Sequence, residues 1–384
     1  MLAIGLMSGT SLDGVDAALV EIKNEKFSLL KFITYPYDML FKEKIMRNLS
    51  DATAKLSEIS SLNFELSEYF VKAIDLLLKE TDYKYDDIDF VSSHGQTIWH
   101  DPKGVKYPTD RKILTKQVPS TLQIGTPAVI AYKTGIKVVS NFRVKDVACG
   151  GEGAPLVPFS EYVLYRSNEK KLVFQNIGGI SNCTYLKKNC SIDDVISFDN
   201  GVGNIMIDYF SKKYFDVPYD KDGSIARSGK VIDNIFSYLL KDEYIYKTYP
   251  KSTGREQFSL EFMEDLSEKL EFSKYDKKDI VCTITEYTAF GIAYSYKNFL
   301  KDIDLVIVSG GGCHNKYLME RIEKLSGYKV ITGDEYGINS DAKEAMAFAV
   351  MGYYTLQNKP SNVKSVTGAK ENVILGDITL WWKM

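Results

Sequence analysis

The sequence predicts a mixed α/β protein whose two domains open in the same way. Two observations carry this prediction. A strand, a glycine-containing turn and a return strand are expected at residues 2–22 and again at residues 171–186. Elsewhere, buried strands alternate with segments whose apolar residues recur at helical spacing. The length of 384 residues is enough for about two domains.

The first part of the chain opens with apolar and β-branched runs that predict consecutive strands, followed by a long helix. Strands are expected at residues 2–6, 15–22, 27–35, 88–92 and 137–141. Helices are expected at residues 55–80, where Leu56, Ile59, Leu62 and Leu66 keep helical spacing, and at 127–134. The loop at 149–155 then interrupts this alternation.

The second part repeats the opening and continues the alternation of strands and helices. Strands are expected at residues 171–177, 183–186, 195–198 and 303–308. Helices are expected from Ile205 onward and at residues 315–325. Domain boundaries have to be inferred from the order of elements, because no repeat of fixed period and no low-complexity linker divides the chain.

Composition excludes several classes of protein. Lys and Arg number 48 against 51 Asp and Glu, a net charge of −3, so no basic field exists to attract nucleic acid or an anionic membrane. Five widely spaced cysteines without a C-x-x-C pair predict neither a disulfide framework nor a zinc cluster, and favour a reducing cytoplasm. We expect a soluble protein, because no run approaches the roughly 20 apolar residues of a membrane span and no basic residue precedes Lys23.

Glycine-rich turns are the first candidates for chemistry. In Gly9-Thr10-Ser11-Leu12-Asp13-Gly14, the glycines let the backbone approach an anion, although a plain polar hairpin turn is the alternative. The turn at 176–182 carries the same two interpretations, and together the two turns indicate one nucleotide clamped between two domains. Gly310 to Gly312 suit contact with a base or ribose, or a tight turn from strand to helix. Neither a G-x-G-x-x-G nor a G-x-x-x-x-G-K-[ST] motif occurs.

Two carboxylates are candidates for catalysis. Asp199 follows the strand predicted at 195–198, where its side chain suits a general base, or it caps the helix that begins near Ile205. Glu344 lies among small and apolar residues in a predicted helix, so a partly buried carboxylate there needs a cation or donor partner. The alternative for Glu344 is a cap at the exposed start of that helix.

Polar residues after two strands form a third group. His94 and Gln96 follow one predicted strand and Arg143 follows another, so they could converge on a ligand, although a lone His is more often structural. The basic and hydroxyl groups at 251–256 are typical of an ordinary solvated loop. A serine hydrolase is disfavoured, because no G-x-S-x-G motif is present.

Six segments in their order and spacing resemble the anhydro-N-acetylmuramic acid kinase family, over nearly the whole chain. They are Gly5–Asp16, Ser93–Thr97, Gly150–Pro158, Phe198–Asn204, Pro250–Glu256 and Ser309–Gly312. The resemblance implies the fold of the sugar kinase, heat-shock protein 70 and actin superfamily, with two ribonuclease-H-like domains and an ATP cleft between them. We expect residues 1–130 with about 360–384 in the first domain and about 131–359 in the second.

The resemblance also assigns roles to individual residues. The first phosphate loop contains Gly9, Thr10, Ser11, Leu12, Asp13, Gly14, Val15 and Asp16. The second contains Gly178 and Gly179, and Gly310, Gly311 and Gly312 lie on the adenosine side. Asp199 matches the catalytic aspartate and Glu344 an active-site glutamate. We assign His94, Gln96, Thr97 and Arg143 to substrate binding, with no metal ligand assigned.

The implied reaction uses ATP and Mg²⁺ to open the anhydro ring of 1,6-anhydro-N-acetylmuramic acid and to phosphorylate oxygen 6. A homodimer that recycles cell-wall sugar is also implied. The chain departs from the family pattern at Glu152, Asn200 and Val202, and Arg143 and Arg255 would have to face the lactyl carboxylate of the substrate. Three alternatives remain: a levoglucosan-type kinase, a nucleotide and sugar sensor without catalysis, and a hexokinase-like transferase.

Overall fold

The computed structural model describes residues 1–9, 11–104, 106–108, 114–116 and 118–381. The side chains of residues 106–108, 114–116, 255 and 256 lie outside this description. The chain folds into two compact units, which are described separately. Unit 1 comprises Met1–Leu164 and Asp341–Met384, and unit 2 comprises Tyr165–Ser340.

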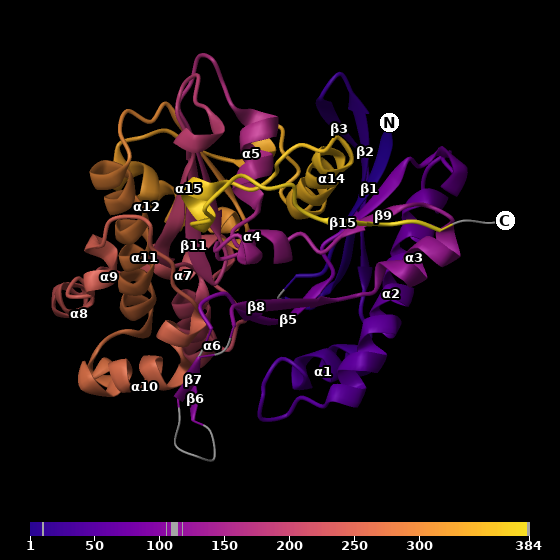
Figure 1. Cartoon of the computed structure of the whole chain (residues 1–384). Helices are drawn as coiled ribbons and strands as arrows, with labels where there is room; N and C mark the ends of the chain where they lie inside the picture. The colour runs from indigo at the N-terminus through magenta and orange to yellow at the C-terminus, as the bar shows by residue number, and fades with distance from the viewer. Residues whose placement is uncertain (10, 105, 109–113, 117, 382–384) are drawn as a thin grey trace. The chain divides into compact units, whose positions relative to one another are not determined.

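The sheet of unit 1 has the strand order β15-β9-β4-β1-β2-β3 (Figure 1). Its strands are β1 (Leu2–Met7), β2 (Gly14–Lys23), β3 (Lys26–Pro36), β4 (Phe90–Ser93), β9 (Val138–Ser140) and β15 (Asp377–Thr379). β1, β2 and β3 pair antiparallel in sequence, whereas β4 is parallel to β1 and β9 is parallel to β4. The carboxyl ends of β1, β4 and β9 therefore lie at one edge of the sheet.

Helices cover both faces of this sheet. Ile4 and Leu6 of β1 belong to the apolar core that includes Leu62 and Leu66 of α2 (Leu56–Lys79). Gly5 points the opposite way, because successive residues of a strand alternate between faces. A Cβ atom on Gly5 would lie 1.9 Å from the carbonyl oxygen of Ala345, so α14 (Lys343–Leu356) packs directly on the β1 backbone. Figure 1 shows α2 and α14 on the two sides of the sheet.

The sheet of unit 2 repeats this design with the order β12-β11-β10-β13-β14. Its strands are β10 (Leu172–Ile177), β11 (Ile180–Leu186), β12 (Ile196–Val202), β13 (Leu305–Ser309) and β14 (Val330–Thr332). The first three again pair antiparallel in sequence, and β13 and β14 again continue parallel to β10. The prediction of two similarly opened, ribonuclease-H-like α/β domains is confirmed.

The core of unit 2 lies between its sheet and a group of helices. Val173 and Ile177 of β10 pack into a core with Ile284 and Tyr296 of α11 (Lys277–Phe299). Helices α6 (Ile205–Phe215) and α12 (Lys316–Ser326) pack on α11. Phe174, on the opposite face of β10, stacks on Tyr165 with ring centroids 5.1 Å apart.

The remaining elements are short apart from α1 and α10. In unit 1 they are α1 (Met39–Arg47), α3 (Pro127–Thr134), α4 (Val144–Ala148), α15 (Lys364–Thr367), η1 (Tyr85–Asp87), β5 (Gln96–Asp101), β6 (Lys106–Pro108), β7 (Leu114–Lys116) and β8 (Ser120–Ile124). α5 (Val157–Tyr165) ends at the first residue of unit 2. Unit 2 adds α7 (Ser224–Ser228), α8 (Asp233–Leu239), α9 (Glu243–Tyr246), α10 (Leu260–Lys269), α13 (Gly333–Tyr336), η2 (Ile192–Asp194), η3 (Lys221–Gly223), η4 (Arg255–Phe258), η5 (Phe272–Lys274) and η6 (Gly311–His314).

The unit boundaries lie at different residues from the domain boundaries expected near 130 and 360. β9 follows residue 130 but pairs with β4, which keeps it in the first sheet. α14 precedes residue 360 but packs on β1 and β2 of that same sheet. Among the helices of the described residues, none has the length and apolar composition needed to cross a membrane.

Candidate active site

The first glycine turn joins β1 to β2 over buried side chains. The Ser8 hydroxyl donates to Gln96 Oε1 at 2.5 Å and lies 2.6 Å from the Tyr37 hydroxyl. Ser8 and Gln96 are buried, and Asp13 accepts the Tyr37 amide through its carbonyl oxygen at 3.1 Å. Gln96 is therefore engaged beneath the turn. Thr10, which the family resemblance assigns to this loop, lies outside the described residues.

The two glycines of this turn serve different purposes. A Cβ atom on Gly14 would lie 2.2 Å from the carbonyl oxygen of Tyr35, so strand pairing requires glycine there. A Cβ atom on Gly9 would meet only Ser11 Oγ, at 4.0 Å, which leaves open space beside the backbone. Leu12 and Val15 bury their side chains, so only their main-chain groups are available to a ligand of this loop.

Asp16 is an acidic residue directly after this turn. It accepts the Thr34 hydroxyl at 2.6 Å. Burial raises the pKa of its carboxyl to about 6. The hydrogen bond from Thr34 opposes this rise, and the negative charges of Glu344, Asp341 and Asp13 add to it. Among the described residues, three or more His, Cys, Asp or Glu side chains do not gather into a metal cluster. The carboxylates nevertheless fit Mg²⁺, which commonly binds through one or two carboxylates together with substrate phosphates.

Glu344 lies in the first turn of α14, on the side of unit 1 that also carries Asp16. Part of its side chain is accessible to solvent. The protein atoms around the carboxyl displace water and so raise its pKa, and the positive charges of Lys343 and Arg143 oppose this rise. Lys343 itself forms a buried ion pair with Glu161 at 2.6 Å. The residue at the N-cap of α14 is Ala342, so Glu344 does not occupy the cap position.

Of the three polar residues that the sequence predicted could converge on a ligand, His94 and Arg143 are bonded to each other. Arg143 donates from Nε to His94 Nε2 at 3.0 Å and from Nη1 to the Gly153 carbonyl oxygen at 2.7 Å. His94 Nδ1 lies 2.9 Å from the Gly95 carbonyl oxygen, so this nitrogen carries the proton and Nε2 accepts. Burial, followed by the charge of Arg143, lowers the pKa of His94 well below its usual value. His94 is therefore neutral and orients Arg143.

Gln96 and Thr97 take separate positions at the start of β5. Gln96 is bonded to Ser8, and Thr97 Oγ1 accepts from Gln123 Nε2 at 3.2 Å. These hydrogen bonds join His94 to Arg143 and Gln96 to the first glycine turn. They do not join all of the assigned substrate residues in one cluster.

The second glycine turn, between β10 and β11, is held by main-chain hydrogen bonds. The carbonyl oxygen of Gly178 accepts the Asn204 amide at 2.7 Å, and that of Gly179 accepts the Gly203 amide at 2.9 Å. The start of α6 is therefore fixed to this turn. Gly310, with φ of +80°, would bring a Cβ atom within 2.5 Å of Asn176 Oδ1, so the triple glycine packs against the same turn.

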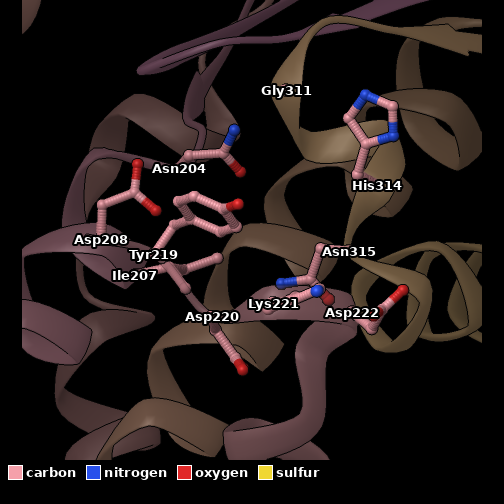
Figure 2. A pocket seen from close by; sticks show the side chains of 10 residues that line it. All are labelled: Asn204, Ile207, Asp208, Tyr219, Asp220, Lys221, Asp222, Gly311, His314 and Asn315. Atoms are coloured by element: carbon pink, nitrogen blue, oxygen red, sulfur yellow. The ribbon is translucent and has the colours of Figure 1, made fainter. Parts of the chain in front are cut away.

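A pocket of about 500 Å³ opens beside Gly311 in unit 2. Figure 2 shows the side chains that line it: Asn204, Ile207, Asp208, Tyr219, Asp220, Lys221, Asp222, Gly311, His314 and Asn315. Burial and then the neighbouring Asp220 raise the pKa of Asp208 to about 6. The volume of this pocket is in the range of small-molecule sites. Sequence reasoning found Gly311 but missed the acidic and aromatic lining, because those residues come from separate segments.

Asp199 lies within β12, whereas the sequence predicted a position just after this strand. Ser181 pairs with Gly201 and Asn182 with Asp199, so Asn200 is an extra residue that forms a bulge in β12. Bulges re-aim neighbouring side chains and are frequent beside active sites. Asp199 Oδ2 accepts the Thr253 amide at 2.9 Å. The capping alternative is wrong, because the N-cap residue of α6 is Asn204.

The segment Lys251–Thr253 is not the solvated loop that the sequence predicted. The Lys251 carbonyl oxygen accepts the Asp199 amide at 3.2 Å. Lys251 Nζ donates to the carbonyl oxygens of Tyr244 and Ile245, at 3.1 and 3.3 Å. Burial lowers the pKa of Lys251 to about 8, although Cys183, Asp242 and Asp199 oppose this shift.

The three departures from the family pattern have different environments. Glu152 pairs with Lys103 at 2.9 Å on the surface, which balances its charge. Asn200 is fully buried and donates to Cys183 Sγ at 3.5 Å. Val202 belongs to the apolar core of unit 2. The side chain of Arg255 lies outside the described residues.

Comparison with known proteins decides the family. The sequence profile described as anhydro-N-acetylmuramic acid kinase matches residues 1–380. The chain belongs to this family. A relative named anhydro-N-acetylmuramic acid kinase from Clostridioides difficile is 45% identical over 99% of this chain and 98% of its own length. One of the same name from Caldanaerobacter subterraneus is 44% identical over 99% and 97%.

One solved structure is more distant in sequence than these relatives. The activator of 2-hydroxyisocaproyl-CoA dehydratase from Clostridium difficile is 13% identical, with a TM-score of 0.45 over 93% of this chain and 96% of that one. A likeness at this distance carries no argument about function. The topology of the two sheets and the family membership therefore rest on the chain itself and on its relatives.

Proposed function

We propose that the chain is an ATP-dependent kinase that opens the 1,6-anhydro ring of 1,6-anhydro-N-acetylmuramic acid and phosphorylates oxygen 6. The products are N-acetylmuramic acid 6-phosphate and ADP. The proposal rests on the orientation of Asp199, which a bulge in β12 and the Thr253 amide fix in a chain of this family. The name of its relatives supplies the substrate class.

Asp199 is the general base of the proposed reaction. In an anhydro sugar, oxygen 6 is bonded to carbon 1, and hydrolysis of such a bond normally needs one carboxyl group to activate water and a second to protonate the leaving oxygen. Asp199 takes a proton from water as the water oxygen bonds to carbon 1. The bond from carbon 1 to oxygen 6 breaks, and oxygen 6 bonds to the γ-phosphorus as ADP leaves. Phosphoryl transfer thus replaces protonation of the leaving oxygen.

The ATP-binding residues are those of the two glycine turns and the triple glycine. Gly9 and Gly178 have space beside their backbone for phosphate oxygens, since a Cβ atom there would meet no heavy atom within 3.5 Å. Of the triple glycine, Gly311 lines the pocket that contains Asn204, Asp208 and His314. We assign this pocket to the adenosine of ATP, because its volume and polar lining suit a nucleoside.

Asp16 and Asp13 are the residues of unit 1 that would hold Mg²⁺. When bound, this ion offsets the negative charge of the phosphates during transfer. Asp16 supports the assignment, because burial and then the negative charges of neighbouring carboxylates raise its pKa, and a divalent cation would relieve that repulsion. The negative charge of Glu344 also acts on Asp16, and we assign Glu344 as a second catalytic carboxylate in addition to Asp199.

Arg143 supports an acidic substrate. Its Nε and Nη1 atoms are bonded to His94 and Gly153, which fixes the guanidinium plane and leaves Nη2 for a carboxylate such as the lactyl group. Gln96 and Thr97 lie on the adjoining strand β5 and are assigned to the sugar hydroxyls. The Lys103–Glu152 pair weakens the repulsion that Glu152 would exert on this substrate.

The cellular setting is also part of the proposal. We propose a cytoplasmic enzyme that works as a homodimer and recycles cell-wall sugar. The spacing of the five cysteines favours a reducing compartment. Light scattering coupled to gel filtration measures the mass of the particle, and a value of one chain, 43.4 kDa, would refute the homodimer.

The deciding experiment measures ADP release by the purified chain with Mg²⁺ and ATP. 1,6-Anhydro-N-acetylmuramic acid and levoglucosan are offered side by side, because levoglucosan lacks the acetamido and lactyl groups. We expect turnover with the muramic sugar and little with levoglucosan. The reaction is repeated in H₂¹⁸O, where ring opening by water places one solvent oxygen on carbon 1 of the product.

Each alternative has its own result in this experiment. Preference for levoglucosan would refute the muramic substrate. A product without solvent oxygen would refute ring opening and indicate transfer to a free hydroxyl. ATP binding without turnover of either sugar would refute catalysis on these sugars and favour a sensor.

A further inference from the structure

The segment Lys251–Thr253 forms two hydrogen bonds with Asp199, and its lysine side chain is half-buried. We propose that Lys251 is a positioning residue that anchors this segment and thereby sets the orientation and charge of Asp199. The inference rests on the proposed function, because it gives Asp199 the role of base. Lys251 itself touches no reacting atom in this scheme.

The Lys251 ammonium is held in an aromatic cage with a polar end. Nζ lies 4.8 Å from the ring centre of Tyr244, 5.1 Å from that of Phe299 and 5.7 Å from that of Phe198. The same atom donates to the carbonyl oxygens of Tyr244 and Ile245 in α9. Cation–π contacts and charged hydrogen bonds are strongest where water is excluded. The cage therefore ties the segment to α9 and to β12.

The tied segment determines where the Asp199 carboxylate points. Two hydrogen bonds join them: the Asp199 amide donates to the Lys251 carbonyl oxygen at 3.2 Å, and the Thr253 amide donates to the side-chain oxygen Asp199 Oδ2 at 2.9 Å. Tyr244, part of the cage, also donates its hydroxyl to the Asp199 carbonyl oxygen at 3.1 Å. One lysine thus links α9, the segment and the base.

Packing alone does not explain why a lysine occupies this aromatic cage. A methionine would fill the aromatic cage without losing the hydration of an ammonium, and the desolvated Lys251 has its pKa lowered to about 8. Within the described part of the chain, no carboxylate oxygen lies within 4.0 Å of its ammonium. Its positive charge nevertheless acts on Asp199.

Several titratable groups share this region with Asp199. Lys251 is one positive group there, and Lys247 Nζ lies 6.0 Å from the Tyr244 ring centre; the side chain of Arg255 lies outside the described residues. Asp242 is the negative neighbour on the α9 side and accepts the Tyr287 hydroxyl at 2.8 Å. Burial raises the pKa of Tyr244, so its hydroxyl is neutral at pH 7. Removal of the Lys251 charge takes away a positive neighbour of Asp199, so the pKa of Asp199 should rise.

Three variants test the role of Lys251. Lys251→Met keeps the side chain in the cage without charge, Lys251→Arg keeps the charge, and Lys247→Met removes an exposed lysine that faces the same tyrosine. We expect Lys251→Met to lower kcat about 10- to 100-fold, because small displacements of a catalytic group have effects of this size. KM for both substrates should change less than about threefold. The acid limb of the pH profile of kcat should move up by about one pH unit.

The control variants separate positioning from folding. Lys251→Arg should restore the acid limb, and Lys247→Met should match the wild type in kcat and in pH profile. A loss of kcat in Lys251→Met that equals its unfolded fraction by circular dichroism, with the acid limb unmoved, would overturn the inference. An equal loss in Lys247→Met would overturn it as well.

A measurement without turnover keeps this inference distinct from the proposed function. The pKa of Asp199 is read by NMR titration of protein labelled with ¹³C at the aspartate carboxyl carbon, and the signal is assigned by its loss in Asp199→Asn. The pKa should rise in Lys251→Met and return in Lys251→Arg. If it rises while the muramic sugar is not turned over, the proposed function fails and the positioning role stands. An unchanged pKa would refute the role of Lys251.

Discussion

The two glycine turns occupy the same place in their units but are held in different ways. In unit 1 the pairs Met7–Asp16 and Gly14–Pro36 bracket a long turn, which rests on the side chains of Ser8, Gln96 and Tyr37. In unit 2 the pair Ile177–Ser181 encloses a short turn, whose carbonyl oxygens accept the amides at the start of α6. Buried side chains therefore support the first turn in addition to its main-chain bonds, whereas the second turn is held by main-chain bonds to the start of α6.

This difference shows how a duplicated topology acquires two kinds of chemistry. The longer turn has room for acidic residues, and Asp13 and Asp16 lie on it or directly after it. The shorter turn carries none, and its unit presents a carboxylate from the bulge in β12. Strand order sets where functional groups can gather, whereas turn length and a single extra residue decide which groups are there.

The largest expected effect tests whether the base belongs to unit 2. Asp199→Asn keeps the size of the side chain and removes the charge that accepts a proton, so kcat should fall about 10²–10⁴-fold. Circular dichroism should show an unchanged fold. The matched control is Asp233→Asn, at an exposed aspartate in α8 of the same unit, which should retain full activity. A kcat within threefold of the wild type in Asp199→Asn would show that Asp199 is not the base.

The next effect concerns glycines that both turns require for packing. Gly14→Ala and Gly203→Ala each place a Cβ atom 2.2 Å from a carbonyl oxygen, of Tyr35 and of Gly178 respectively. Backbone must move to accommodate either methyl group, so the free energy of unfolding should fall by about 1–3 kcal/mol in each variant. Urea denaturation measures this loss. A loss in only one of them would show that the two turns differ in rigidity as well as in their bonds.

Glycines with open space beside them separate ligand binding from stability. Gly9→Ala and Gly178→Ala bring a Cβ atom no closer than 4.0 and 3.6 Å to a neighbouring heavy atom. The free energy of unfolding should change by less than about 0.5 kcal/mol. KM for ATP should rise about tenfold, a loss of about 1.4 kcal/mol, because the methyl group occupies the space of a phosphate oxygen. An unchanged KM in one variant would exclude that turn as a phosphate loop.

The smallest effect is the pH dependence that Asp16 gives to unit 1. Its folded-state pKa of about 6 exceeds the usual 3.8, so the folded chain binds more protons than the unfolded chain between these values. Its contribution to stability is therefore present at low pH and lost as pH rises through 6. Asp16→Asn should be about 1 kcal/mol more stable than the wild type at pH 7, after discounting for solvent exposure, with no gain at pH 4. Urea denaturation at both values of pH measures this difference, and an equal gain at both would contradict the shift.

The sequence was informative wherever a pattern is local. Apolar periodicity predicted the strands that open each unit and the long helix α2, because alternating or helical spacing records which face is buried. Six segments in a fixed order indicated the family, and the comparison with relatives confirmed it. His94, Gln96 and Arg143 were expected to converge on a ligand because each follows a strand, and the structure brings His94 and Arg143 together.

Only the tertiary structure decided the contacts that join distant segments. β9 and α14 belong to unit 1 because they pair with and pack on its sheet, which no local pattern records. Asp199 is aimed by a bulge and by an amide 54 residues away along the chain, and the Lys251 cage collects rings from β12, α9 and α11. Apolar spacing reports burial along one element. Hydrogen bonds and ring contacts between elements depend on how those elements pack, so a single sequence determines the family and the strands but leaves the orientation of the base to the fold.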